Sequence, residues 1–281
     1  MKLLSYRFQG VRRFGALTGD GVIDLAARVG DLYPDLRAVL TAGALPAVAA
    51  IAAAAPPDHR LDEIALDPVI PNPAKILCVG LNYKTHVLEV GRELPTHPSV
   101  FSRLHNTLIA HGEAMIRPRA STNFDFEGEL AVIVGRGGRH IAEADALSHV
   151  AGYTCFNDGS VRDFQRHSVT AGKNFPDTGP LGPWMVTADE IPDPTRLTVA
   201  TRLNGAEVQR DSVAHMIFPI PRIIAYLSTF AELEPGDVIA TGTPHGVGLG
   251  RTPPLWMKAG DTIEVEIDGV GTLRNTIVDE V

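Results

Sequence analysis

The stretch that decides the fold runs from Phe126 to Gly135 and reads FEGELAVIVG. The residues after its two glutamates are apolar and largely β-branched, which is typical of a strand. Side chains alternate between the faces of a strand, so Glu127 and Glu129 should point the same way. Two adjacent carboxylates repel each other, and a hard divalent metal that prefers oxygen ligands would compensate them. The plainer alternative is a solvated Glu-x-Glu face without a metal.

A third acid supports the metal interpretation. Asp158 follows an apolar, strand-like run at 150–156 and stands directly before Gly159. Functional residues concentrate on loops at the ends of rigid elements. We therefore expect Asp158 to join the two glutamates in a three-carboxylate site.

Composition limits the classes of protein to consider. The chain has 281 residues, 44% of them apolar, which is enough for one large domain or for a small and a larger one. Its net charge of −8 without a Lys/Arg cluster argues against a nucleic-acid partner. The longest apolar stretch, about 42–55, contains a proline and is too short to cross a bilayer, so no membrane partner is expected.

The start of the chain and its cysteines indicate the compartment. The first residues, MKLLSYR, lack the apolar core of a signal peptide, so we expect a cytoplasmic protein. Cys78 and Cys155 each lie in an apolar strand-like run. They are interpreted as buried free thiols in a reducing compartment, with a buried disulfide between them as the alternative.

The chain divides near residue 70. Residues 1–70 are predicted as a small α/β domain, with a strand at 3–8, a hairpin around the turn 18–21, and an Ala/Leu-rich helix at 35–55. Prolines at 68, 71 and 73 mark the junction. Residues 71–281 are predicted as a β-rich α+β catalytic domain, because strand patterns outnumber helical ones and do not alternate with them. The expected strands are 115–117, 129–134, 150–156, 184–187, 197–203, 237–241, 262–267 and 270–278, and the expected helices are 83–91, 142–147, 158–167 and 219–229.

A candidate base follows the strand that contains Cys78. If the chain is helical from Tyr83 onward, His86 and Glu89 share a face. A carboxylate beside an imidazole fixes its tautomer and raises its basicity, which prepares a general base. A surface His–Glu pair on a short helix is the alternative.

Two further segments carry candidate binding groups. Ser160 can cap a helix that carries Arg162 and Gln165, and Lys173 follows in a glycine-flanked loop where it could neutralise a carboxylate or an enolate. The glycine-rich loop TGTPHGVG at 241–248 offers backbone N–H groups and the Thr243 hydroxyl. A solvated loop lysine and glycines that serve turn geometry alone are the alternatives.

Together these residues resemble the fumarylacetoacetate hydrolase family from about Ile76 to the C-terminus. Each motif alone is weak, but their order along the chain is specific. The motifs are VGLNY at 79–83 with His86 and Glu89, Glu127-x-Glu129-Leu130, Asp158-x-Ser160-x-Arg162-Asp163-x-Gln165, Gly172-Lys173, PLGPW at 180–184, and TGTP at 241–244 followed by GVG at 246–248.

The resemblance implies a structure and roles for the site residues. It implies a mixed β-roll catalytic domain in a homodimer, with a lid from Asn82 to about His111. Mg²⁺ or Mn²⁺, with Ca²⁺ as an alternative, would be bound by Glu127, Glu129 and Asp158. The catalytic residues would be His86, Glu89 and Lys173, and the substrate-binding residues would be Tyr83, Arg103, Gln165 and Thr243.

Arg103 is a departure from the family pattern, because members often carry lysine near this position. Its guanidinium keeps the charge and can bind a carboxylate through two hydrogen bonds. The end of the substrate far from the metal has no assigned partner in the sequence; the candidates are Arg103, His105, His111, His215 and His245.

The expected reaction is hydrolysis of a carbon–carbon bond in an acylpyruvate such as fumarylpyruvate or maleylpyruvate, in aromatic or sugar-acid catabolism. The small-molecule substrate would be a 2-oxo acid whose enolate the metal stabilises. Decarboxylation of an oxaloacetate-type acid, and isomerisation or hydration of an unsaturated 2-oxo acid, are alternatives on the same scaffold. A metal-stabilised binding protein without activity is the non-enzymatic alternative.

Overall fold

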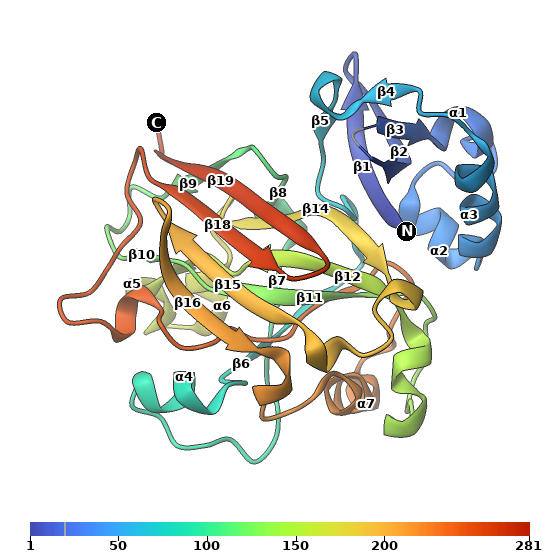
Figure 1. Ribbon diagram of the computed structural model, residues 1–281. Helices are drawn as coiled ribbons and strands as arrows, with labels where there is room; N and C mark the ends of the chain where they lie inside the picture. Colours follow the sequence, from blue (N-terminus) through green and yellow to red (C-terminus); the bar gives the residue numbers. More distant parts are fainter. Residues whose placement is uncertain (20) are drawn as a thin grey trace.

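The computed structural model describes residues 1–19 and 21–281 (Figure 1). Within them the strands form sheets of twelve, five and two strands, which confirms the predicted β-rich fold. None of the helices described in these ranges is long and apolar enough to cross a membrane. The central path of the large sheet runs β4 (His59–Arg60), β3 (Gly21–Asp24), β2 (Val11–Thr18), β1 (Lys2–Phe8), β14 (Gly179–Thr187), β12 (Val150–Asn157), β11 (Gly128–Val134), β17 (Val238–Ala240), β6 (Ile76–Gly80) and β7 (Ser99–Arg103), with β5 (Ala65–Leu66) on β1 and β8 (Leu108–Ile109) on β14.

The strands expected in the N-terminal unit form, whereas the expected helix is broken. The strands β1, β2 and β3 pair antiparallel, although Asp20 in the predicted turn lies outside the described residues. The expected helix at 35–55 is divided into α2 (Leu36–Thr41) and α3 (Leu45–Ala54), and α1 (Ala26–Val29) precedes them. Gly43 causes the break, because its φ of 63° is left-handed and ends the first helix.

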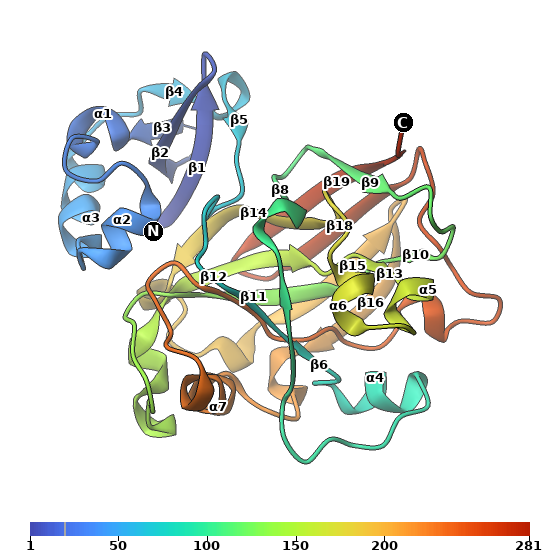
Figure 2. The same cartoon turned by 180° about the vertical axis from the view of Figure 1, so that it is seen from behind.

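The N-terminal strands continue the sheet formed by the rest of the chain. β1 pairs antiparallel with β14, where Lys2 lies opposite Val186 and Leu3 opposite Met185. Leu3 also belongs to the same apolar cluster as Ile133 of β11. The boundary near residue 70 therefore separates two stretches of sequence within one continuous sheet (Figures 1 and 2).

Strand β11 lies between two cores, which explains its uninterrupted apolar sequence. Leu130, Val132 and Val134 pack into one apolar cluster, and Ala131 and Ile133 pack into another on the opposite face. The first cluster also contains residues of the five-stranded sheet, so that sheet covers this face. Its strands, in order, are β16 (Ala206–Ser212), β15 (Thr198–Leu203), β18 (Thr262–Ile267), β19 (Gly271–Asp279) and β9 (Ala114–Arg117).

The helices agree with the sequence patterns less closely than the strands do. The predicted helices at 83–91 and 219–229 appear as α4 (Lys84–Glu89) and α7 (Ile220–Phe230). The segment predicted at 158–167 begins as β13 (Ser160–Val161), which pairs with β10 (Phe124–Asp125), and only then forms α5 (Arg162–Gln165). β16 and α6 (Val169–Lys173) were not predicted. Single-turn or 3₁₀ segments complete the chain: η1 (Leu61–Glu63), η2 (His105–Thr107), η3 (Glu143–His149), η4 (Ala188–Glu190), η5 (Pro194–Arg196), η6 (Val213–His215) and η7 (Gly248–Gly250).

Candidate active site

Three buried carboxylates converge at the start of β11. Glu127 and Glu129 lie on the same face of the strand, and Asp158 follows the neighbouring strand β12. Each contributes an oxygen, and these oxygens lie within 4.8 Å of one another. Antiparallel pairing of β11 with β12 places the start of one strand beside the end of the other, which brings Asp158 to the glutamates.

Lys173 lies between two of these carboxylates. Its Nζ is 2.6 Å from Glu127 Oε2 and 2.6 Å from Asp158 Oδ2. Burial opposes the charge of this ammonium, but Asp158 and Glu127 outweigh burial and raise its pKa above the ordinary value. Lys173 is therefore a fixed positive charge in the site rather than a neutral amine.

Glu129 carries the negative charge that is least compensated. Burial, followed by the charges of Asp158 and Glu127, raises its pKa well above the usual range, whereas Lys173 and Arg162 outweigh burial at Glu127 and lower that pKa to about 2. One oxygen of Glu129 accepts a hydrogen bond from Gly242 N at 2.8 Å. Among the described residues, this region has four buried carboxylates and three buried cations. The carboxylates are Asp125, Glu127, Glu129 and Asp158, and the cations are Arg103, Arg162 and Lys173. Three converging oxygen donors with excess negative charge fit a divalent cation.

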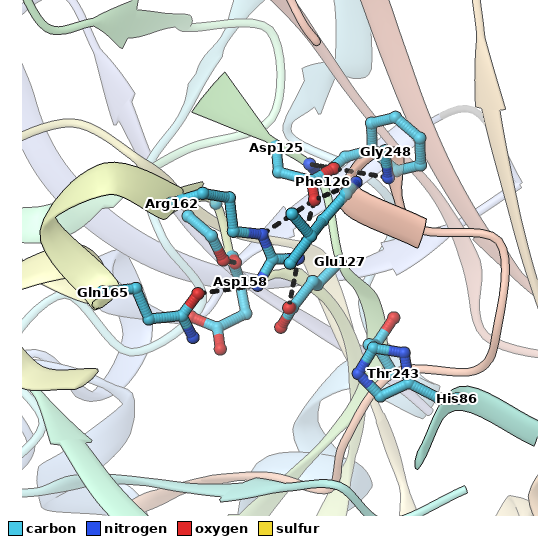
Figure 3. Close-up of polar contacts among 12 residues, drawn as sticks. His86, Asp125, Phe126, Glu127, Asp158, Arg162, Gln165, Thr243 and Gly248 are labelled. Atoms are coloured by element: carbon cyan, nitrogen blue, oxygen red, sulfur yellow. Dashed lines mark hydrogen bonds and ion pairs between the residues drawn. The ribbon is translucent and has the colours of Figure 1, made fainter. Parts of the chain in front are cut away.

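Asp125 is a structural member of the site that the sequence patterns did not reveal. Arg162 donates from Nε to Asp125 Oδ2 at 2.8 Å, and its Nη2 lies 2.8 Å from Glu127 Oε1 (Figure 3). Asp125 also accepts from the backbone N–H groups of Gly248 and Leu249. It therefore joins the glycine-rich loop to the cluster of carboxylates. Its position two residues before Glu127 is the only sequence signal for it.

The predicted pair of His86 and Glu89 forms on α4. His86 Nδ1 lies 3.4 Å from Glu89 Oε2, and both side chains are largely buried. The backbone N–H of Gly246 donates to both oxygens of Glu89, at 2.9 and 3.0 Å. The Gly246 N–H thus holds the Glu89 carboxylate, which in turn orients the imidazole of His86.

A cavity of about 430 Å³ opens beside these groups. Four of the predicted site residues, His86, Lys173, Gln165 and Thr243, line it. Figure 3 shows His86 and Thr243 across an open space from Gln165. Gln165 accepts a hydrogen bond from Arg162, which leaves its amide N–H groups for a ligand. The remaining lining residues are Gly80, Leu81, Val90, Arg92, Ser99, Phe101, Glu127, Glu129, Arg162, Arg166, Val169 and Leu249.

Two predicted substrate contacts lie elsewhere. Tyr83 is packed in the apolar core and does not line the cavity. Arg103 lies behind the carboxylates: its guanidinium donates to Asp158 Oδ1 at 2.6 Å and to Thr178 Oγ1 at 2.7 Å, and it is fully buried. Its position indicates that Arg103 orients Asp158 rather than binding substrate. Tyr83 cannot reach the substrate because its phenol ring is buried in the core. Arg103 cannot bind substrate because its guanidinium already donates hydrogen bonds to protein groups.

The expected lining of the distal end also differs. None of Arg103, His105, His111, His215 and His245 lines the described cavity, whereas Arg92 and Arg166 do. Part of the segment expected as a lid is built into the sheet, because β7 pairs with β6 over its whole length. Only their closeness to Glu89 and Gln165 in the sequence could have pointed to Arg92 and Arg166.

Comparison with known proteins gives a consistent picture. Residues 75–278 match the model of the fumarylacetoacetate (FAA) hydrolase C-terminal family. The oxaloacetate tautomerase YisK of Bacillus subtilis is 45% identical over 225 residues, which cover 78% of this chain and 75% of that protein.

Solved structures agree over the whole length. A crystal structure of a putative HpcE protein from Mycobacterium smegmatis superposes with a TM-score of 0.89 at 35% identity and full coverage of both chains. Maleylpyruvate hydrolase from Sphingobium sp. SYK-6, solved in complex with manganese and pyruvate, superposes with a TM-score of 0.84 at 28% identity, again with full coverage. The chain therefore belongs to the fumarylacetoacetate hydrolase family.

Proposed function

We propose that this chain is a divalent-metal-dependent enzyme that acts on a 2-oxo acid through its enolate. The observation that carries the proposal is a cavity lined by Glu127, Glu129, Lys173 and His86. Asp158 completes the carboxylate cluster, and Glu89 contacts the imidazole of His86. Glu127, Glu129 and Asp158 would hold Mg²⁺ or Mn²⁺. The solved relative that contains manganese and pyruvate supports this choice of metal and of substrate class.

The residues around the cavity have separate chemical roles in this proposal. When bound, the cation would act as a Lewis acid and a template for the 2-oxo acid end of the substrate. Lys173 supplies a second positive charge beside the developing enolate oxygen, in a buried setting where charge interactions are strong. His86, oriented by Glu89, is the group placed to carry a proton.

Tautomerisation of an oxaloacetate-type acid is the first candidate reaction. A proton leaves the enol oxygen and a proton is added to the other carbon of the enol double bond, so the reaction needs no water. One fixed charge and one proton carrier satisfy that requirement, and both line the cavity. The relative of 45% identity is named an oxaloacetate tautomerase, which favours this reaction.

Hydrolysis of an acylpyruvate is the second candidate. It needs the same enolate stabilisation together with an activated water, and the imidazole of His86 could supply the base. The maleylpyruvate hydrolase with the same fold over its whole length favours this reaction.

One panel of substrates separates the two reactions. The protein is incubated with Mg²⁺ and with the enol form of oxaloacetate, acetylpyruvate, fumarylpyruvate or maleylpyruvate, and the enol absorbance and released pyruvate are followed. Loss of the oxaloacetate enol without pyruvate indicates a tautomerase, and pyruvate with a second acid indicates a hydrolase. Pyruvate with carbon dioxide would indicate a decarboxylase. Absence of any turnover across the panel would contradict the proposal.

A further inference from the structure

Four cationic side chains line the cavity, and they differ in their partners. Arg162 and Lys173 are buried and engaged by carboxylates of the site. Arg92 and Arg166 are exposed, and neither forms an ion pair with another residue in the part of the chain that the structure describes. The buried cations therefore mark the closed end of the cavity, and the exposed arginines mark its mouth.

The backbone around Arg92 is held although its side chain is free. Arg92 follows the last turn of α4, and its N–H donates to Val87 O at 3.0 Å. The N–H of Val90 donates to His86 O in the same turn. The start of the Arg92 side chain is thus fixed relative to the candidate base.

Arg166 is held in a similar way at the end of α5. It directly follows Gln165, whose side chain lines the cavity. The acid nearest to it in sequence, Asp163, already accepts hydrogen bonds from Ser121 and Asn123. The hydrogen bonds from Ser121 and Asn123, and to a smaller extent the charge of Arg166, lower the pKa of Asp163. Among the described residues Arg166 forms no ion pair with Asp163, so its guanidinium can bind an anion in the cavity that it lines. Figures 1 and 2 both place α4 and α5 at the same end of the molecule, away from the N-terminal unit.

We propose that Arg92 and Arg166 bind a second carboxylate of the substrate and make the enzyme selective for dicarboxylic 2-oxo acids. The assignment rests on the proposed function, which places the 2-oxo acid end at the carboxylate triad. The far end of the ligand then points to the mouth, where neither guanidinium group forms an ion pair with a described residue. Guanidinium groups bind carboxylates through paired, charge-assisted hydrogen bonds. The apolar side chains of Val90, Val169 and Leu249 line the same cavity and suit the carbon chain between the two ends.

The test compares ligands that differ in the second carboxylate. Binding of pyruvate, oxaloacetate and 2-oxoglutarate is measured by calorimetry in the presence of Mg²⁺, for the wild-type chain and for Arg92→Gln and Arg166→Gln. Both arginines are exposed, so these changes should leave the fold intact. Lys84→Gln is the matched control, because the substitution removes the same charge from an exposed position on α4. Lys84 does not line the cavity.

The wild-type chain should bind at least one dicarboxylate more tightly than pyruvate. Each arginine variant should weaken binding of that dicarboxylate by roughly 10- to 100-fold, the range expected for a hydrogen bond between charged groups. The affinity for pyruvate should stay unchanged. Lys84→Gln should leave both unchanged. The assignment is wrong if neither dicarboxylate binds more tightly than pyruvate, or if the advantage persists in both arginine variants, or if Lys84→Gln reduces it equally.

This readout is independent of turnover. A chain that binds dicarboxylates through the two arginines but converts none of the substrate panel would contradict the proposed function and leave the arginine assignment standing. A chain that converts the panel, with a preference unaffected by Arg92→Gln and Arg166→Gln, would contradict only the assignment.

Discussion

His86 is the residue on which proton transfer depends in this account. Its Nδ1 is turned toward Glu89, so the opposite ring nitrogen is the one available to the cavity. We expect His86→Gln to lower kcat by roughly 10²- to 10⁴-fold, the usual contribution of a positioned acid or base. Binding of Mn²⁺, followed by electron paramagnetic resonance, should stay unchanged. Full turnover in this variant would remove His86 from the mechanism.

Arg103 allows a test of how burial changes the contribution of an ion pair to the free energy of unfolding. Arg103–Asp158 and Arg117–Asp279 have the same N–O distance of 2.6 Å, but the first pair is fully buried and the second is partly exposed. Arg103→Met removes one of the two buried cations that contact Asp158 and leaves only Lys173, so it should lower the free energy of unfolding by about 3–5 kcal/mol. Arg117→Met should lower it by about 0.2–1 kcal/mol. Urea unfolding measures both, and equal losses would show that Arg103 does not support Asp158 as described.

The sequence predicted the residues of the site that belong to local patterns. Glu127 and Glu129 follow from strand alternation, and His86 with Glu89 follows from helical spacing. Asp125 could not be predicted, because its role depends on the loop containing Gly248, which reaches it only in the folded chain. The same holds for the buried position of Arg103.

The glycine-rich loop after β17 positions Glu89 through Gly246. This glycine has a φ of 101°, and a Cβ on it would lie 2.1 Å from Val208 O. Gly246→Ala should therefore displace the loop, remove the N–H donor to Glu89 and lower kcat.

Gly260→Ala is the control for this change. Gly260 has a similar φ of 90°, but nothing lies within 4 Å of the added Cβ. This variant should lose some stability in urea and retain kcat. If the two variants have the same kcat, the loop does not position Glu89.

The elements themselves were predictable where one pattern was unambiguous. The buried spacing of Ile220, Ile223, Ile224 and Leu227 marks α7 clearly. β16 was missed because its sequence, AEVQRDS, is largely polar. The strand is held by pairing with β15. This segment is a strand because it pairs with another strand in the folded chain, and its local sequence pattern does not indicate that pairing.

The continuity of the large sheet predicts how the molecule depends on its first seventy residues. Removing residues 1–70 would expose the edge of β14 and uncover the apolar cluster that contains Leu3 and Phe14. We expect the remaining chain to aggregate or to unfold at a lower urea concentration than the full chain. An unchanged, cooperative urea midpoint would show that 71–281 is an independent domain. The homodimer and the cytoplasmic location stay predictions.

The most direct test of the account measures metal dependence. Protein treated with a chelator is titrated with Mn²⁺ while bound metal and conversion of the oxaloacetate enol are followed together, for the wild-type chain and for Glu129→Gln. The account predicts that turnover is lost on chelation and returns in proportion to one bound Mn²⁺ per chain. In Glu129→Gln both turnover and tight Mn²⁺ binding should be lost. Full turnover in the chelated protein, or tight Mn²⁺ binding that survives Glu129→Gln, would contradict it.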